Sequence, residues 1–269
     1  MVRNESDRLR RVIVSPPKTE YFRVDDPEAH NIGEVAQKER ALAQHRRLCA
    51  LLRQFGAEVI RLDELAGHPN CVFTRDTSLV TPRGYIRLRM GLRTRRGEED
   101  WMAEALDSLG IPCAGSIRAP GTAEGGDVVL AGEVAFIGQS ERTNAPGLKQ
   151  MSRLLESMGY EVRALLLPPP HLHIGGAMSI VDSDTILCCG RLFPPRFFSG
   201  FRTISVRCRH SVSANVICLG QKEVIVEKEN TAAARALEGA GFKVHSLDLS
   251  EFVKGRGGPT CLILPLDRG

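Results

Sequence analysis

The residue best suited to act as a nucleophile in this sequence is Cys261, close to the C-terminal end. It follows a glycine-containing segment, residues 257–260, and precedes an apolar run that begins at Leu262. Glycines let backbone N–H groups approach a thiolate or its covalent adduct closely. The alternative interpretation, a core cysteine at the start of a strand, applies to most other cysteines of the chain. The glycine-rich approach distinguishes Cys261 from them and makes it the candidate nucleophile.

Two histidines, His171 and His173, follow a run of three prolines at residues 168–170. The prolines favour a stiff, extended approach that would fix the position of the His171 ring. Because residues i and i+2 of a strand project from one face, the two histidines could also form half of a metal site. A catalytic zinc normally needs three protein ligands, and no further cluster of His, Asp or Glu has recognisable spacing. A satisfied surface or core histidine is the remaining interpretation.

Three acidic residues lie in segments that mix polar residues with apolar ones or with glycine. Glu124 and Asp127 flank two glycines, so they could orient a histidine or bind a cation, or simply form a solvated turn. Asp76 lies inside an otherwise mainly apolar pattern, residues 71–80. An acid in such a place must be paired or functional, and Arg75 is its nearest candidate partner.

A repeated pattern describes the elements that must position these residues. The end of an amphipathic helix, a glycine and the start of a strand recur four times in the sequence. Each glycine suits the left-handed conformation that follows a helix C-terminus. The four glycines are Gly56, Gly110, Gly159 and Gly241. Pairs of short apolar runs around a turn accompany them at residues 77–89, 127–138, 178–189 and 215–226, and residues 11–14 start the remaining module.

The repeat predicts a closed ring. The long interval between Gly159 and Gly241 leaves room for a fifth, degenerate copy around residues 174–208. Self-similarity at a period of about 50 residues indicates a propeller-like or solenoid array. We expect each module to contain a helix on the outside and strands near a central axis. Such a ring removes exposed sheet edges and leaves a central funnel, where the polar segments converge and a small molecule could bind.

Composition limits the class of protein. The chain has 269 residues, of which 42% are hydrophobic and 25% charged, values typical of a globular protein. We expect a single α/β domain over residues 1–269. The N-terminus is polar, and no apolar run approaches the roughly 20 residues of a membrane span. The eight cysteines include no CxxC pair, so we expect them to be reduced, in the cytoplasm and away from membranes.

Most of the net charge of +4 comes from an arginine-rich stretch, residues 83–96. Binding to nucleic acid is one interpretation of such a patch. The stretch lacks interleaved stacking aromatics, and the chain has only one Trp and three Tyr, so we expect no nucleic-acid partner. The stretch is instead a solvated face, or one or two of its arginines hold a carboxylate.

The ordered set of polar segments resembles the guanidine-modifying pentein superfamily, which includes dimethylarginine dimethylaminohydrolases, arginine deiminases and amidinotransferases. The matching motifs are Phe-x-Arg-Asp ending at Asp76, Glu-Gly-Gly-Asp starting at Glu124, His-Leu-x starting at His171, and the C-terminal Cys261. The resemblance extends over almost the whole chain. It implies a five-bladed ββαβ propeller with pseudo-fivefold symmetry, in agreement with the repeat count.

The resemblance also implies roles for individual residues. Cys261 matches the nucleophile, and His171 rather than His173 matches the catalytic histidine, because the family's His-Leu-x₅-Met spacing is met by His171 and Met178. Glu124 matches the acid that orients this histidine. Asp76 matches the carboxylate that holds the guanidinium, with help from Asp127. Arg142 matches an arginine that holds the substrate α-carboxylate, and Arg89 resembles a second one. Asn70 and Phe73 complete the implied substrate-binding set.

The implied activity is hydrolysis of a C–N bond at a guanidinium carbon, through a covalent thiouronium on Cys261. Length favours the dimethylargininase type, which converts Nω-methylated arginine to citrulline. Asn70 and Arg75 look more like arginine deiminase, but His173 replaces that enzyme's second guanidinium-binding aspartate. A deiminase, a metal-dependent amidohydrolase using His171 and His173, and a non-catalytic binding protein are the alternatives. The expected partner is a small guanidino substrate, with no metal or organic cofactor, and a homodimer is left open.

Overall fold

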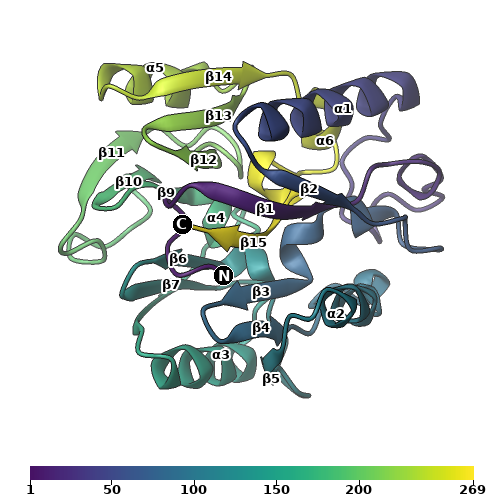
Figure 1. Ribbon diagram of the computed structural model, residues 1–269, viewed down its shortest axis with the longest axis horizontal. Helices are drawn as coiled ribbons and strands as arrows, with labels where there is room; N and C mark the ends of the chain where they lie inside the picture. The colour runs from purple at the N-terminus through teal and green to yellow at the C-terminus, as the bar shows by residue number, and fades with distance from the viewer.

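Fifteen short strands form five sheets of three strands each in the computed structural model, which describes residues 1–269 (Figure 1). In every sheet the first two strands along the repeat pair antiparallel, and the third joins the second in parallel. A parallel neighbour requires a crossover connection, and an α-helix supplies it in four of the five modules. The predicted five-bladed ββαβ propeller is confirmed.

The modules follow one another along the chain. The first consists of β15 (Leu264–Arg268), β1 (Leu9–Val14), α1 (Lys38–Gln54) and β2 (Glu58–Arg61). The second contains β3 (Ser78–Thr81), β4 (Gly84–Arg87), α2 (Glu98–Ser108) and β5 (Cys113–Ser116). The third contains β6 (Val128–Ala131), β7 (Val134–Gln139), α3 (Ala145–Ser157) and β8 (Glu161–Leu166). The fourth has α4 (Ile174–Ala177), β9 (Met178–Asp182), β10 (Thr185–Cys189) and β11 (Arg202–Val206). The fifth has β12 (Ile217–Gly220), β13 (Glu223–Glu227), α5 (Thr231–Gly239) and β14 (Lys243–Leu247), followed by α6 (Ser250–Val253).

Helix α3 shows how the sequence sets these elements. The side chain of Asn144 accepts a hydrogen bond from Gly147 N at 2.9 Å, which caps the first turn. Met151 and Leu155, one turn apart, are fully buried against the sheet. The helix ends before Gly159, whose φ of 90° is left-handed. Gly56, Gly110 and Gly241 also have positive φ, so the predicted helix–glycine–strand repeat is confirmed.

The fourth module departs from the prediction that every module contains a crossover helix. Between β10 and β11 the chain forms turns in place of a helix. Three phenylalanines of this connection, Phe193, Phe197 and Phe198, are buried, and the last two pack on Phe136 of β7 with ring centroids 5.3 and 5.5 Å away. This aromatic cluster packs the connection against the sheet of the third module.

Cys189 and Cys208 form a disulfide across the end of the β10–β11 pair, with their Cα atoms 5.4 Å apart. The expectation that all cysteines are reduced is therefore wrong for this pair. The parallel pairing of β10 with β11 brings the two residues into bridging distance, which their spacing in the sequence did not reveal. The other six cysteines are free.

The ring closes through the first module, because β1 pairs antiparallel with β15 from the other end of the chain. The two termini lie close together beside β15 in Figure 1, and the Met1 amino group forms an ion pair with Asp267. No helix has both the length and the apolar composition needed to cross a membrane.

A short turn leads into the first strand of every module, and these turns lie at the centre of the ring. They are 3₁₀ turns at Thr74–Asp76, Gly125–Asp127 and Pro259–Leu262, helix α4, and a turn at residues 211–214. The first of them contacts both other 3₁₀ turns, and α4 contacts the second. The repeat thus brings together segments that are far apart in the sequence.

Candidate active site

The central turns surround a narrow axial cavity. Residues from several modules line it, among them Arg75, His173, Asn215 and Cys261. Each occupies a turn before a first strand or the residue next to such a turn. Polar and nucleophilic side chains from different modules therefore line the same cavity.

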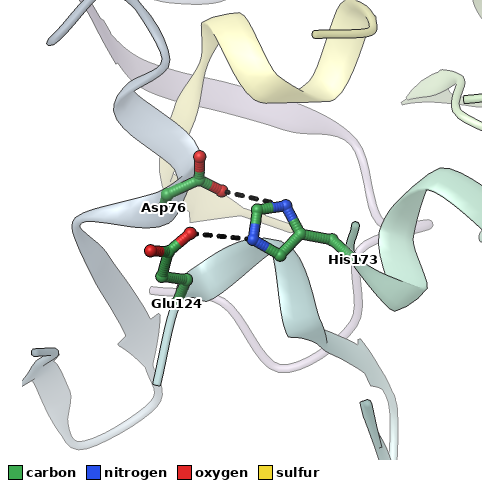
Figure 2. Close-up of side chains that lie close together, drawn as sticks. All are labelled: Asp76, Glu124 and His173. Carbon is green, nitrogen blue, oxygen red and sulfur yellow. Dashed lines mark hydrogen bonds and ion pairs between the residues drawn. The ribbon is translucent and has the colours of Figure 1, made fainter. Parts of the chain in front are cut away.

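His173 and Glu124 form a buried pair at this centre (Figure 2). His173 Nε2 lies 2.9 Å from Glu124 Oε2, and His173 Nδ1 lies 3.8 Å from Asp76 Oδ1. The two side chains come from neighbouring modules, since Glu124 precedes the turn before β6 and His173 precedes α4. Burial lowers the pKa of His173, but the carboxylates of Asp76, Asp127 and Glu124 outweigh it and raise the pKa above its ordinary value. The arrangement favours an imidazolium.

Glu124 is held in its ionised form by several donors. Burial would raise its pKa, but Arg142 and His173 hold the pKa well below its usual range. Arg142 Nη1 lies 3.3 and 3.4 Å from the two carboxylate oxygens. Gly91 N donates to Oε1 at 3.0 Å. A fixed carboxylate of this kind orients the ring that binds it and stabilises its positive charge.

Asp76 has one free oxygen. Its Oδ2 accepts a hydrogen bond from Arg95 Nη1 at 2.6 Å, whereas Oδ1 is buried and has no hydrogen-bond partner. Arg95 also binds Glu98 Oε2 through Nη2 and Nε, at 2.7 and 2.9 Å. Gly126 packs against the free oxygen, and a Cβ there would lie 2.7 Å from Asp76 Oδ1. A buried acceptor without a partner can receive a ligand donor.

Asp127 has partners for both oxygens. Ser140 Oγ donates to Oδ2 at 2.6 Å, and Ile174 N donates to Oδ1 at 3.1 Å. Burial raises the pKa of Asp127 to about 6, against the opposing effect of His173 and these hydrogen bonds. Asp127 therefore fixes the first residue of α4, directly after His173. In this arrangement both of its oxygens already accept a hydrogen bond from the protein.

Cys261 is half-buried within the last 3₁₀ turn. Gly258 N lies 3.3 Å from the sulfur and donates to it. Burial and the Asp76 carboxylate raise the pKa of the thiol to about 11, while the Gly258 N–H, Arg75 and Arg95 act in the opposite direction. The thiol is thus protonated near neutral pH until a further positive charge enters the site.

His171 lies outside this cluster, and the prediction that Glu124 orients it is wrong. His171 is not part of the buried turn. Its backbone N–H donates to Pro168 O at 3.2 Å, which closes a turn at the surface. The ring lines an open groove with Arg191 and the Cys189–Cys208 disulfide. The His171–His173 metal pair is not formed either, because the two rings face different spaces.

The sequence contained a signal for His173. Residues 174–177 form helix α4 directly after it, and Gly176 has no room for a side chain, because a Cβ would lie 2.0 Å from Ser211 O. This run of small residues marks the tightly packed turn that enters the ring. Counting the spacing back from Met178 selected His171 instead.

Asp76, Glu124 and His173 together are close enough to hold a metal ion, although Arg95 and Arg142 each bind one of the carboxylates.

The remaining predicted residues surround the cluster. Arg142 is buried on Glu124, as described above, and its other guanidinium N–H groups make no hydrogen bond within the protein. Arg89 is half-buried and donates to Gly121 O at 3.3 Å. Asn70 is buried and donates to His30 O at 3.1 Å. Phe73 is buried beside Tyr21, with ring centroids 5.9 Å apart. None of these four contacts Cys261 through a hydrogen bond.

Two site residues had no predicted role. Arg95 was one of several arginines in residues 83–96, and the structure shows that it holds two buried carboxylates. The alternative in which an arginine of this stretch holds a carboxylate is therefore confirmed. Asn215 contacts the segments of both His173 and Cys261. No role was predicted for it from the sequence.

Comparison with known proteins identifies the family. The family model for eukaryotic N,N dimethylarginine dimethylhydrolase matches residues 24–194, and that for arginine deiminase matches residues 199–268. The N(G),N(G)-dimethylarginine dimethylaminohydrolase of Pseudomonas aeruginosa is 30% identical over 84% of this chain and 88% of its own length. An uncharacterized protein of Aeropyrum pernix is 29% identical over 97% of both chains.

A solved structure supports the same relationship. The P. aeruginosa dimethylarginine dimethylaminohydrolase, as a cysteine-to-serine mutant complexed with citrulline, superimposes with a TM-score of 0.84 at 27% identity, covering 96% of this chain and 99% of the other. Arginine deiminase of Listeria monocytogenes is 26% identical, and the alignment covers 74% of this chain and 62% of that protein. This pentein chain belongs to the dimethylarginine dimethylaminohydrolase family.

Proposed function

We propose that this protein hydrolyses Nω-methylated arginine to citrulline and a methylamine, with Cys261 as nucleophile and His173 as acid/base. The observation that carries the proposal is the convergence of a thiol, a carboxylate-bound imidazole and a carboxylate with a free oxygen on one centre. Hydrolysis at a guanidinium carbon needs those three groups. The family relationship supports the same reaction.

The substrate cation would bind first. Asp76 Oδ1 is free to accept a guanidinium N–H. The cation would then offset the effect of the Asp76 carboxylate on the neighbouring thiol and lower its pKa from about 11. A thiolate would therefore form mainly when substrate is bound. This would restrict the reactivity of Cys261 to the complex.

His173 would carry the protons. The thiolate attacks the guanidinium carbon, and the imidazolium gives its proton to the departing amine as the C–N bond breaks. A covalent thiouronium on Cys261 remains. The neutral imidazole then takes a proton from water, and the resulting hydroxide attacks the same carbon. Collapse of this adduct breaks the C–S bond and releases citrulline. Glu124 would keep the ring oriented and stabilise its charged form through both halves.

The free donors around the centre would hold the rest of the substrate. Arg142 has guanidinium N–H groups without protein partners, which suit the α-carboxylate. Arg89 would be a second carboxylate ligand, and Asn70 and Phe73 would line the path of the side chain. His171 would take no part in proton transfer. The cytoplasmic location expected from the sequence stays a prediction.

Free arginine is the second candidate substrate, because the C-terminal part of the chain matches the arginine deiminase model. The count of acceptors favours a methylated guanidine. Among the three site carboxylates, only Asp76 Oδ1 lacks a partner, whereas all oxygens of Glu124 and Asp127 have one. A guanidinium without methyl groups presents more N–H donors than a dimethylated one, so it needs more acceptors.

A citrulline assay tests the proposal. Asymmetric dimethylarginine, monomethylarginine and arginine are offered separately to the purified protein, with Cys261→Ser as the matched control and a chelator-treated sample to detect metal dependence. We expect citrulline from the methylated substrates, none from Cys261→Ser, and no effect of the chelator. Full activity of Cys261→Ser would contradict the nucleophile assignment, and activity confined to arginine would make the enzyme a deiminase.

A further inference from the structure

Five central turns lead into the five modules, and four of them bring residues to the proposed reaction centre. Those residues are Asp76, Asp127, His173 and Cys261. The fifth turn, at residues 211–214, precedes β12 and is followed directly by Asn215. Asn215 is only 1% exposed and lines the same axial cavity as the histidine and the cysteine. The pseudo-fivefold repeat therefore places a polar, buried side chain at the remaining position around the centre.

The amide of Asn215 joins the two segments that carry the reacting groups. Thr260 N donates to Asn215 Oδ1 at 2.9 Å, and Asn215 Nδ2 donates to Thr260 Oγ1 at 2.5 Å. The same Nδ2 donates to Gly175 O at 2.8 Å. A backbone N–H can only donate and a carbonyl can only accept, so these partners fix the orientation of the amide. Thr260 directly precedes Cys261, and Gly175 lies two residues after His173.

The backbone around Asn215 is anchored on the histidine side. Ala214 N donates to Gly176 O at 3.0 Å within the turn that follows His173. Val216 N donates to Ser179 Oγ at 3.1 Å at the start of β9. Bonds on both sides of Asn215 thus tie its main chain to the fourth module. Its side chain then extends from that module to the cysteine segment.

The cysteine segment packs closely on this amide. A Cβ at Gly258 would lie 2.5 Å from Asn215 Oδ1, so only glycine fits there without a shift. The N–H of Gly258 is the group that donates to Cys261 Sγ at 3.3 Å. The Asn215 amide therefore supports the Gly258 backbone that faces the sulfur, in addition to Thr260, the residue before the cysteine.

We propose that Asn215 is a positioning residue that sets the distance between Cys261 and His173. The catalytic consequence rests on the function proposed above, whereas the clamp itself is a property of the fold. Its removal would leave Thr260 N and Gly175 O without partners in a partly buried place. A displacement of about 1 Å between reacting groups can reduce a rate by about 100-fold. The clamp thus affects the rate of the chemical step more than the affinity for substrate.

The first test compares two asparagines of the same region. Asn215→Ala removes the clamp. Asn230→Ala is the matched control, because Asn230 is also buried, at 6% exposure, and its Nδ2 donates to Ser213 O at 2.9 Å away from the reacting groups. We expect kcat to fall about 30- to 100-fold in Asn215→Ala with KM within about threefold, as a geometric misalignment predicts. Asn230→Ala should keep kcat within about twofold, and Thr260→Ser, which retains both bonding groups, should do the same.

The second test does not require turnover. Hydrogen exchange by mass spectrometry on the full chain should be faster over residues 257–262 in Asn215→Ala and unchanged there in Asn230→Ala. If Asn215→Ala does not fold, Asn215→Asp replaces it, since it keeps the acceptor for Thr260 N and loses the donor to Gly175 O. The clamp is overturned if the Asn215 variant exchanges residues 257–262 at the wild-type rate, or if its kcat equals that of Asn230→Ala. If the wild-type protein hydrolyses no guanidino compound, the proposed function fails and the exchange comparison alone decides the clamp.

Discussion

His171 and His173 are two residues apart and lie in opposite kinds of environment. His173 is 7% exposed and is surrounded by Asp76, Glu124 and Asp127, which together raise its pKa. His171 is half-buried beside an open groove, has no carboxylate partner, and has a pKa that partial burial lowers. A two-residue step along the chain thus separates a ring whose pKa the surroundings raise from one whose pKa they lower. Surroundings rather than motif spacing decide which histidine can act as an acid.

The largest expected effect comes from removing each ring in turn. His173→Ala should lower kcat for citrulline formation by about 10²- to 10⁴-fold, because general acid catalysis is lost. His171→Ala should keep kcat within about threefold, since the ring contacts no reacting group. Steady-state kinetics on both variants measures the difference. A greater loss in His171→Ala than in His173→Ala would reverse the assignment.

Removing the carboxylate of the pair should have a smaller effect. Glu124→Gln takes away a charge that raises the pKa of His173, so that pKa should fall. The imidazolium would then be lost at a lower pH, and the decline of kcat on the alkaline side should move to lower pH, with kcat at neutral pH about 10- to 100-fold lower.

An NMR titration of His173 in the Cys261→Ser background, with and without Glu124→Gln, checks this shift directly. The His171 signal in the same spectra is the internal control, and the pKa of His171 should be the same with and without Glu124→Gln. An unchanged His173 titration would show that Glu124 does not stabilise the imidazolium.

The smallest effect on activity is expected from the disulfide in the outer region. Cys208→Ser opens the bridge to Cys189, which closes a span of 19 residues. A loop of this length typically contributes about 3 kcal/mol to the free energy of unfolding. We expect that loss in urea unfolding experiments, with kcat within about twofold. A tenfold fall in kcat without loss of stability would show that the groove beside His171 takes part in catalysis.

The repetitive part of the fold could be predicted from the sequence because each module carries its own local signals. Gly56, Gly110 and Gly159 mark helix ends through a backbone conformation that glycine favours. The fourth module could not be predicted in the same detail. Its crossover helix is replaced by a connection whose phenylalanines, such as Phe197, are ordered only by contacts with β7. Such tertiary contacts leave no period in the sequence.

The site was predicted in part for a similar reason. Asp76, Glu124 and Cys261 lie in glycine-rich or conspicuously polar segments, and the structure places them around one centre. The predicted pairing of His171 with Glu124 was wrong because spacing alone does not show which residue enters the buried turn. Arg95 could not be told from the neighbouring arginines in the sequence, because its pairing with the buried carboxylates of Asp76 and Glu98 is visible only in the structure.

The proposed mechanism depends on a covalent intermediate on Cys261. Rapid acid quenching of the enzyme during turnover of dimethylarginine, followed by mass spectrometry of the proteolysed chain, tests it most directly. We expect a thiouronium adduct on the peptide that contains Cys261, formed and lost at rates that match citrulline release. Citrulline production with no adduct, or an adduct on another cysteine, would contradict it.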